Sequence, residues 1–240
     1  MSARSLRICL WSGPRNVSTA LMYSFAQRSD TAVVDEPLYG HYLRISGARH
    51  PGRAEVLASM DTDGDRVMRR LIGDASAKPV LFMKHMAHHL TQVDDGFLAL
   101  TAHVLLIRDP RDMLTSLTRQ LPDAKLADTG LERQCRLLAQ LRSLGQAPPV
   151  IDAQRLLGDP ARILATLCSR LGLAFEPAML HWPAGPKPYD GVWARHWYDN
   201  VHRSTGFESR PRSRDALPGR LLPLLAECRP HYDELFACAI

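Results

Sequence analysis

Two segments of this chain each combine a buried strand, a tight turn and a helix, and this repeated pattern constrains the fold more than any other feature. Residues 6–11 are apolar and precede a turn with Gly and Pro, and helical spacing of apolar residues returns at 19–28. A second apolar run, 103–107, is followed by a proline that suits the first turn of a helix over 110–120. In both segments, the strand and the helix meet at one edge of the predicted sheet.

Strand and helix patterns alternate along the rest of the chain. We expect further strands at 31–35, 79–84 and 149–152, where nearly every residue is apolar. Such runs are typical of a parallel sheet with helices on both faces. The sequence therefore predicts an α/β fold, a three-layer sandwich with a mainly parallel central sheet, in one domain over residues 1–240. The other expected helices are 51–73, 91–99, 128–145, 159–171 and 217–237.

The turn after the first strand predicts a binding site for an anionic group. Backbone N–H groups and the positive end of the helix dipole meet at a helix N-terminus and favour phosphate-like oxygens. The turn consists of Gly13, Pro14, Arg15, Asn16, Val17, Ser18 and Thr19. Arg15 adds a positive charge, and Ser18 and Thr19 add hydroxyl donors. No Gly-Lys-Ser/Thr follows Gly13, which disfavours phosphoryl transfer that depends on ATP or GTP and magnesium.

The second segment predicts a second anion site. Arg108 directly follows the strand, and Ser116 lies on the helix that begins near Pro110. With a rise of about 1.5 Å per residue, Ser116 lies roughly 9 Å along this helix from Pro110. Two separated sites of this kind indicate a nucleotide that carries phosphates at two positions.

These motifs resemble those of the sulfotransferases that use 3′-phosphoadenosine 5′-phosphosulfate (PAPS), in particular the bacterial branch. The first loop is similar to their 5′-phosphosulfate loop, P-[KR]-S-G-[ST]-T, with Asn16 and Val17 in place of the commoner Ser-Gly. The second is similar to their 3′-phosphate motif, since Ser116 follows Arg108 by eight positions. Because Val17 replaces a glycine, we expect this turn to keep a negative φ there or to carry strain.

The resemblance implies a P-loop NTPase-like sulfotransferase fold and PAPS as co-substrate, with no metal ion. It implies transfer of a sulfuryl group to a hydroxyl or amine of a small-molecule acceptor. Arg15 and the two hydroxyls of its loop would hold the 5′-phosphosulfate, and Arg108 and Ser116 would hold the 3′-phosphate. Segment 183–215, the least regular part of the chain, would form a lid or a wall of the acceptor pocket.

The reaction needs a base for the acceptor proton and a cation for the leaving group. Glu36 ends the second strand before a proline, and bacterial members of the family have a glutamate base at this place. His85 is the second candidate base, because a Lys-x-His motif ends the equivalent strand in the cytosolic branch, although His85 directly follows Lys84. Lys84 and Arg15 would stabilise charge on the leaving group. His88 and His89 remain alternatives for the base.

Composition narrows the remaining choices. The five cysteines lack metal-ligand spacing, which favours reduced thiols in a cytoplasmic protein. The first apolar run, 6–11, is too short for a membrane span. The net charge of +5 suits an anionic donor. A late arginine cluster reads as a solvated loop rather than a nucleic-acid site. It comprises Arg203, Arg210, Arg212, Arg214 and Arg220.

Two other functions stay open from the residues alone. A divergent P-loop kinase-like phosphotransferase would require ATP and magnesium. A non-catalytic nucleotide-binding module would bind the nucleotide and transfer nothing. The acceptor and the oligomeric state are not encoded in any motif that we recognise.

Overall fold

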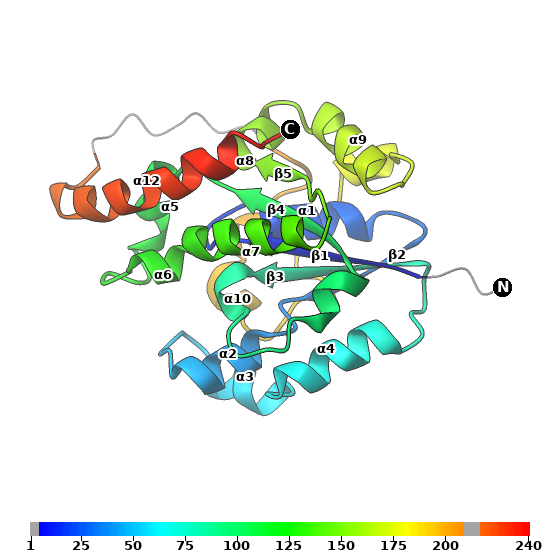
Figure 1. Cartoon of the computed structure of the whole chain (residues 1–240), viewed down its shortest axis with the longest axis horizontal. Helices are drawn as coiled ribbons and strands as arrows, with labels where there is room; N and C mark the ends of the chain where they lie inside the picture. Colours follow the sequence, from blue (N-terminus) through cyan, green and yellow to red (C-terminus); the bar gives the residue numbers. More distant parts are fainter. Residues whose placement is uncertain (1–4, 209–216) are drawn as a thin grey trace.

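The computed structural model describes residues 5–208 and 217–240, and its centre is a parallel β-sheet (Figure 1). Within the described residues the sheet has five strands in the order β2-β3-β1-β4-β5, and every neighbouring pair is parallel. The strands are β1 (Leu6–Ser12), β2 (Thr31–Asp35), β3 (Val80–Met86), β4 (Ala102–Ile107) and β5 (Val150–Asp152). This arrangement confirms the predicted α/β fold with its central parallel sheet.

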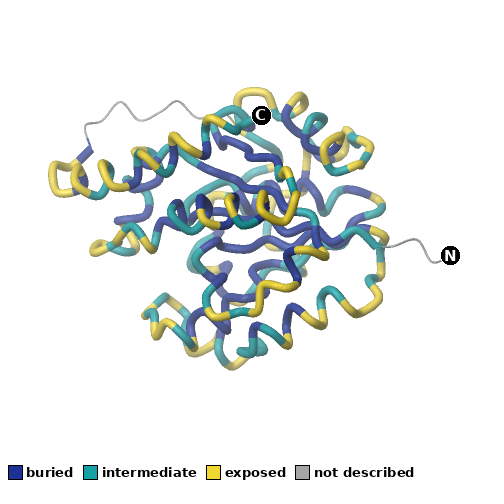
Figure 2. The backbone as a smooth tube through the Cα atoms, viewed as in Figure 1, coloured by how far each residue is buried: buried dark blue, intermediate teal, exposed yellow. Residues whose placement is uncertain are grey.

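Helices cover both faces of the sheet because strand side chains alternate in direction and both sets are apolar. Cys9 and Trp11 of β1 pack with α4, α7 and α12, whereas Ile8 and Leu10 pack with α1, α8 and α9. The helices are α1 (Ser18–Ala26), α2 (Tyr39–Ser46), α3 (Arg53–Ser59), α4 (Gly64–Gly73), α5 (Pro110–Leu117), α6 (Leu126–Thr129), α7 (Leu131–Ser143), α8 (Ala153–Gly158), α9 (Pro160–Arg170), α10 (Ala194–Trp197), α11 (Asp199–His202) and α12 (Leu222–Phe236). The strands are the most deeply buried layer of the three (Figure 2).

The structure corrects several predicted helices. The prediction of a single helix over 51–73 is wrong, because this segment forms two helices, α3 and α4. The side chain of Asp63 accepts a hydrogen bond from Arg66 N and starts the second of them. The helix predicted over 128–145 is interrupted by Gly130, whose φ of 74° is left-handed. Residues 96–100 form a 3₁₀ helix, and α2 had not been predicted.

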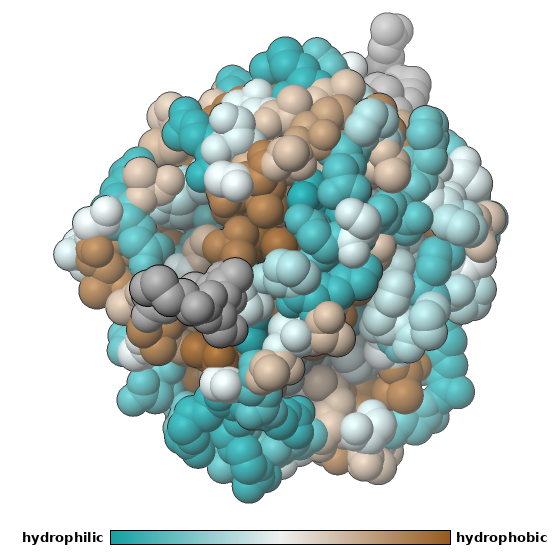
Figure 3. Space-filling model, turned by 90° about the vertical axis from the view of Figure 1, so that its right-hand side faces the viewer, coloured by the Kyte–Doolittle hydropathy of each residue, from teal (hydrophilic) through white to brown (hydrophobic). Residues whose placement is uncertain are grey.

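The described part of the irregular segment, 183–208, contains the two short helices α10 and α11. Residues 209–215 of the predicted lid lie outside the described residues, as do Arg210, Arg212 and Arg214 of the arginine cluster. No described helix has the length and apolar character needed to span a bilayer. Figure 3 shows the side of the molecule where the chain enters β1, with hydrophilic residues over much of the surface and apolar residues in separate patches near the middle and at the margins.

Candidate active site

A cavity of ≈ 560 Å³ lies at the carboxyl ends of the strands, where parallel α/β sheets place their ligands. Its lining residues come from the loop after β1, from the ends of β2 and β3, from α5 and from segment 183–208. They include all the residues predicted to bind the nucleotide except Gly13, which lies directly behind the loop. The sheet thus brings the two predicted anion sites to one place.

The loop after β1 is tightly folded. Arg15 has a left-handed φ of 53°, whereas Val17 has a φ of −90°, so the position of the missing glycine needs no positive φ. The Asn16 side chain holds the turn, because its Nδ2 donates to Leu106 O at 3.0 Å and its Oδ1 accepts from Val17 N at 2.8 Å. Gly13 has no room for a side chain, since a Cβ there would lie 2.5 Å from the carbonyl oxygen of Thr129.

Arg108 and Ser116 contact this loop directly. Arg15 Nε donates to Ser116 Oγ at 2.8 Å, and Arg108 Nη1 donates to the Arg15 carbonyl at 2.6 Å. Asp109 starts α5 by accepting from Arg111 N, so the helix N-terminus has a fixed direction beside the loop. Burial and the charge of Arg108 lower the pKa of Arg15, which is the effect expected of cations held together around an anion site.

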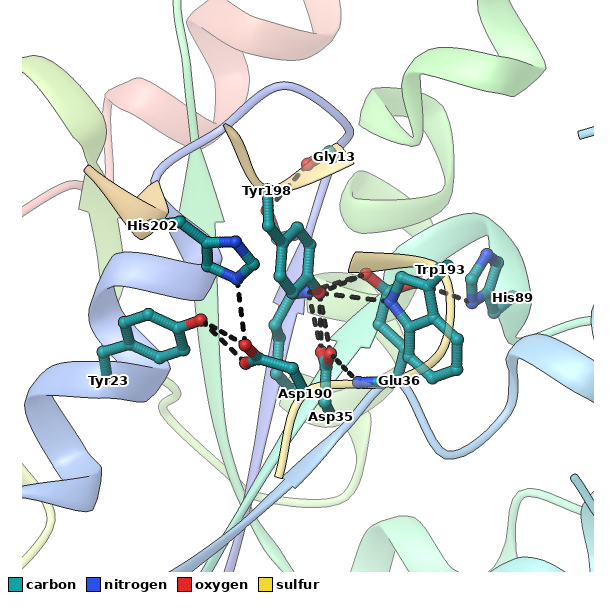
Figure 4. A network of polar contacts seen from close by, with 12 residues as sticks. Gly13, Tyr23, Asp35, Glu36, His89, Asp190, Trp193, Tyr198 and His202 are labelled. Carbon is teal, nitrogen blue, oxygen red and sulfur yellow. Dashed lines mark hydrogen bonds and ion pairs between the residues drawn. The ribbon is translucent and has the colours of Figure 1, made fainter. Parts of the chain in front are cut away.

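A buried charge cluster lies at the ends of β2 and β3. Lys84 Nζ donates to Asp35 Oδ1 at 2.9 Å, to Glu36 Oε1 at 2.6 Å and to Tyr198 Oη at 2.6 Å. The side chains of Lys84 and Asp35 are each 1% exposed, and that of Glu36 is 10% exposed. Figure 4 shows Asp35, Glu36 and Tyr198 converging on this point. Two carboxylates thus share one ammonium group, and the charge of the cluster is −1 when both are ionised.

Glu36 is held in an unusual conformation. Its φ of 39° is left-handed, and its N–H donates to the Lys84 carbonyl at 2.8 Å, so the chain turns sharply out of the sheet before Pro37. Burial raises the pKa of Glu36, Lys84 opposes this shift, and Asp35 adds to it. The result is a carboxyl group at the cavity wall with a raised proton affinity.

Segment 183–208 is tied to the charge cluster through Asp35 and to α1 through Asp190. Tyr198 Oη donates to Asp35 Oδ2 at 2.8 Å, and Gly191 N donates to the same oxygen at 3.2 Å. Asp190 accepts from Tyr23 Oη at 2.7 Å and lies 3.0 Å from His202 Nε2. The sequence analysis missed Asp35 and Tyr198. The place of Asp35 beside Glu36 was a usable signal, whereas nothing in the sequence links Tyr198 to a lysine 114 positions away.

The structure does not bring His85 together with the other predicted catalytic residues. Neighbouring strand residues point to opposite faces, so His85 points away from the side of Lys84 and stacks on Trp11 with ring centroids 4.4 Å apart. Burial lowers its pKa to about 3, and neither ring nitrogen has a hydrogen-bond partner in the described structure. His88 and His89 do line the cavity. The described residues contain no group of three side chains suited to hold a metal ion.

A tight loop at the carboxyl edge of a parallel sheet, beside a buried carboxylate and lysine, defines a P-loop-like α/β fold. The chain belongs to the sulfotransferase family, since the family model for the sulfotransferase domain matches residues 6–237. This match confirms the resemblance seen in the motifs.

Solved structures agree with this assignment of the fold. The chain is similar to the sulfotransferase domain of the Synechococcus PCC 7002 olefin synthase, with 17% identity, a TM-score of 0.58 and coverage of 100% of this chain and 97% of that chain. It is also similar to the sulfotransferase domain from the curacin biosynthetic pathway, with 17% identity, a TM-score of 0.52 and coverage of 95% and 96%.

Two curated relatives come from Arabidopsis thaliana. They are named branched-chain-amino-acid aminotransferase-like proteins 1 and 2, and they are 40% and 38% identical to this chain over 226 residues. The match covers 94% of this chain and 40% of each relative. The chain therefore spans well under half the length of these relatives.

Proposed function

We propose that the protein transfers a sulfuryl group from PAPS to a hydroxyl or amine of a small molecule. The observation that carries this proposal is the contact of Arg108 and Ser116 with the Arg15 loop, in a cavity that continues to Glu36 and Lys84. In this arrangement the loop holds the 5′-phosphosulfate and the Arg108 side holds the 3′-phosphate. The sulfur atom then faces the charge cluster.

Glu36 is the base in this proposal. Its Oε1 accepts from Lys84, while its Oε2 points toward His89, whose Nδ1 is 3.9 Å away. The acceptor oxygen or nitrogen attacks the sulfur, a new bond to sulfur forms, and the acceptor proton passes to Glu36. The bond between sulfur and the bridging phosphate oxygen breaks on the opposite side. The products are the sulfated acceptor and adenosine 3′,5′-bisphosphate.

Arg15 and the N–H groups of its loop stabilise the charge that develops on the leaving phosphate. Lys84 has a different role from the one that the motif suggested, since its ammonium is already shared by Asp35 and Glu36. We assign it to holding Glu36 in place and to favouring its ionised form. His85 has no role in this mechanism.

The five cysteines are all free thiols, and this supports the further proposals of a reducing, cytoplasmic environment and of one domain with no disulfide framework. The donor and acceptor assignments do not depend on either.

Calorimetry without magnesium tests the donor. Adenosine 3′,5′-bisphosphate is expected to bind the wild type in the micromolar range, and Arg108→Ala is expected to weaken binding by at least roughly tenfold. Arg136→Ala is the matched control, because Arg136 is exposed and pairs with Glu132 on the surface of α7, away from the cavity. Binding of Mg-ATP in place of the bisphosphate would reject the proposal and favour a phosphotransferase.

A further inference from the structure

The part of the cavity beyond Glu36 has a wall of aromatic and histidine rings. Tyr39 N donates to Glu36 O at 2.9 Å, so the wall begins beside the proposed base, and Tyr39 Oη lies 2.9 Å from His50 Nδ1. His89 stacks against both Tyr39 and Tyr42, with centroid distances of 4.8 and 4.6 Å. Because each ring is fixed by its neighbours, the wall is a rigid surface suited to the apolar body of a ligand.

Asp128 lies at the other end of this wall. It is half-buried and lines the cavity. Burial raises the pKa of Tyr42, and the charge of Asp128 adds to this shift. Burial lowers the pKa of His50, and Asp128 opposes this shift. Asp128 and His50 also both line a smaller neighbouring cavity of ≈ 240 Å³, so the carboxylate lies close to this histidine. The wall therefore runs from one carboxylate, Glu36, to another, Asp128.

The charges that line the cavity are separated. Arg15, Arg108 and Arg119 lie around the anion-binding loop, where Arg108 and Arg119 both act on the charge of Arg15. Lys84 is held by two carboxylates. The histidines near Asp128 add no positive charge, since burial lowers the pKa of His88 to about 3. Asp109, Asp112 and Glu208 also line the cavity. Among the lining carboxylates, Asp128 is the one whose charge acts on both Tyr42 and His50, and a cationic ligand group beside these two rings would meet it.

His89 marks the position of the reacting group. The residue is 2% exposed, and its Nδ1 has no hydrogen-bond partner in the described structure. Nδ1 lies 3.9 Å from Glu36 Oε2, which is too far for a direct hydrogen bond. A hydroxyl oxygen beside these two atoms could bond to both of them at ordinary distances.

We infer that the acceptor is a hydroxyl compound that carries a protonated amine at its far end, an inference that rests on the proposed function. Its hydroxyl lies between Glu36 and His89, its body lies along Tyr39 and Tyr42, and its ammonium pairs with Asp128. In the reaction, the hydroxyl proton passes to Glu36 as the oxygen bonds to sulfur. The ammonium keeps its protons and serves recognition alone.

Three probe phenols that differ in one end group test this inference: tyramine (cationic), 4-ethylphenol (neutral) and 3-(4-hydroxyphenyl)propionate (anionic). Their binding is measured by calorimetry with adenosine 3′,5′-bisphosphate at saturation. The test variant is Asp128→Asn, which keeps an oxygen to accept from Lys125 N, the bond that Asp128 Oδ2 makes at 2.8 Å. Asp74→Asn is the control, since Asp74 is exposed, lines neither this cavity nor the smaller one beside Asp128, and changes the net charge equally.

Tyramine is expected to bind the wild type and the control roughly tenfold more tightly than 4-ethylphenol, and the propionate is expected to bind most weakly. In Asp128→Asn the preference for tyramine should fall to within about twofold. Four results would overturn the inference. The wild type could bind tyramine and 4-ethylphenol equally, bind the propionate more tightly than tyramine, or bind none of the probes. The fourth is a preference for tyramine that survives in Asp128→Asn. None of these outcomes touches the donor proposal, which fails only if the bisphosphate itself does not bind.

Discussion

Replacement of Lys84 by methionine is the most direct test of the buried charge cluster. The ammonium has three oxygen partners within 2.9 Å, and the side chains of Lys84 and Asp35 are each 1% exposed. Methionine fills a similar volume but leaves Asp35 and Glu36 as buried carboxylates without a counter-ion. Loss of one partner of a buried ion pair typically costs about 3–5 kcal/mol, because the remaining charge is not solvated.

The expected loss is large relative to a total stability of about 5–15 kcal/mol, so urea denaturation followed by circular dichroism can measure it. The pH dependence gives a second readout. A raised pKa of Glu36 in the folded state contributes stability at low pH that is lost as the pH rises through that pKa. Without Lys84 the pKa of Glu36 rises further, so the deficit of Lys84→Met should shrink as the pH falls from about 8 to about 6.

Two further variants separate charge from packing. Lys78→Met is the matched control, because the Lys78 ammonium makes only a long contact of 3.5 Å, to the carbonyl of Arg28, in the described structure. Combining Lys84→Met with Asp35→Asn and Glu36→Gln removes the unpaired charges and should recover most of the lost stability. The reasoning is refuted if Lys84→Met unfolds within about 1 kcal/mol of the wild type, or if its deficit grows as the pH falls.

Three other substitutions address separate parts of the site. Glu36→Gln is expected to lower kcat by roughly 10²–10⁴-fold and to leave binding of adenosine 3′,5′-bisphosphate unchanged, and comparison of turnover with calorimetry checks both. Gly13→Ala places a Cβ against the Thr129 carbonyl and should weaken bisphosphate binding by roughly tenfold or more. Gly73→Ala is its control and should leave binding unchanged, because no atom lies within 4 Å of the added Cβ. His85→Leu removes two ring nitrogens that have no hydrogen-bond partner in the described structure, so the free energy of unfolding should change by less than about 1.5 kcal/mol. Turnover should persist in this variant. A loss of turnover comparable to that of Glu36→Gln would restore His85 as a candidate base.

The strands and the turns that follow β1 and β4 could be predicted from the sequence because local signals specify them. Continuous apolar runs marked all five strands to within two residues of the observed bounds in the described structure. Pro110 marked the start of α5, where the structure has it at the first helical position. Helix α2 was missed because its residues, Tyr39–Ser46, mix glycine, histidine and tyrosine without a clear apolar stripe over eight residues.

The charge cluster could not be predicted because its members are brought together by topology. Asp35 ends β2, Lys84 lies near the end of the neighbouring strand β3, and the two residues face each other in the parallel register. A strand order of β2-β3-β1 is a property of the whole sheet, which no local pattern encodes. The opposite orientation of His85 did follow from strand alternation, as its one-residue offset from the Lys-x-His pattern indicated.

Segment 183–208 completes the cluster as well as covering the cavity. Tyr198 Oη accepts from Lys84 and donates to Asp35. Trp193 Nε1 donates to Tyr198 Oη at 3.2 Å. Desolvation strengthens each of these bonds, so removing the segment would admit water to the cluster and weaken the hold of Lys84 on Glu36. The position of the segment and the ionisation of Glu36, the proposed base, are therefore coupled through Tyr198. If this coupling holds, Tyr198→Phe should shift the pH dependence of kcat while leaving bisphosphate affinity intact, whereas a segment that only covers the cavity would change affinity alone.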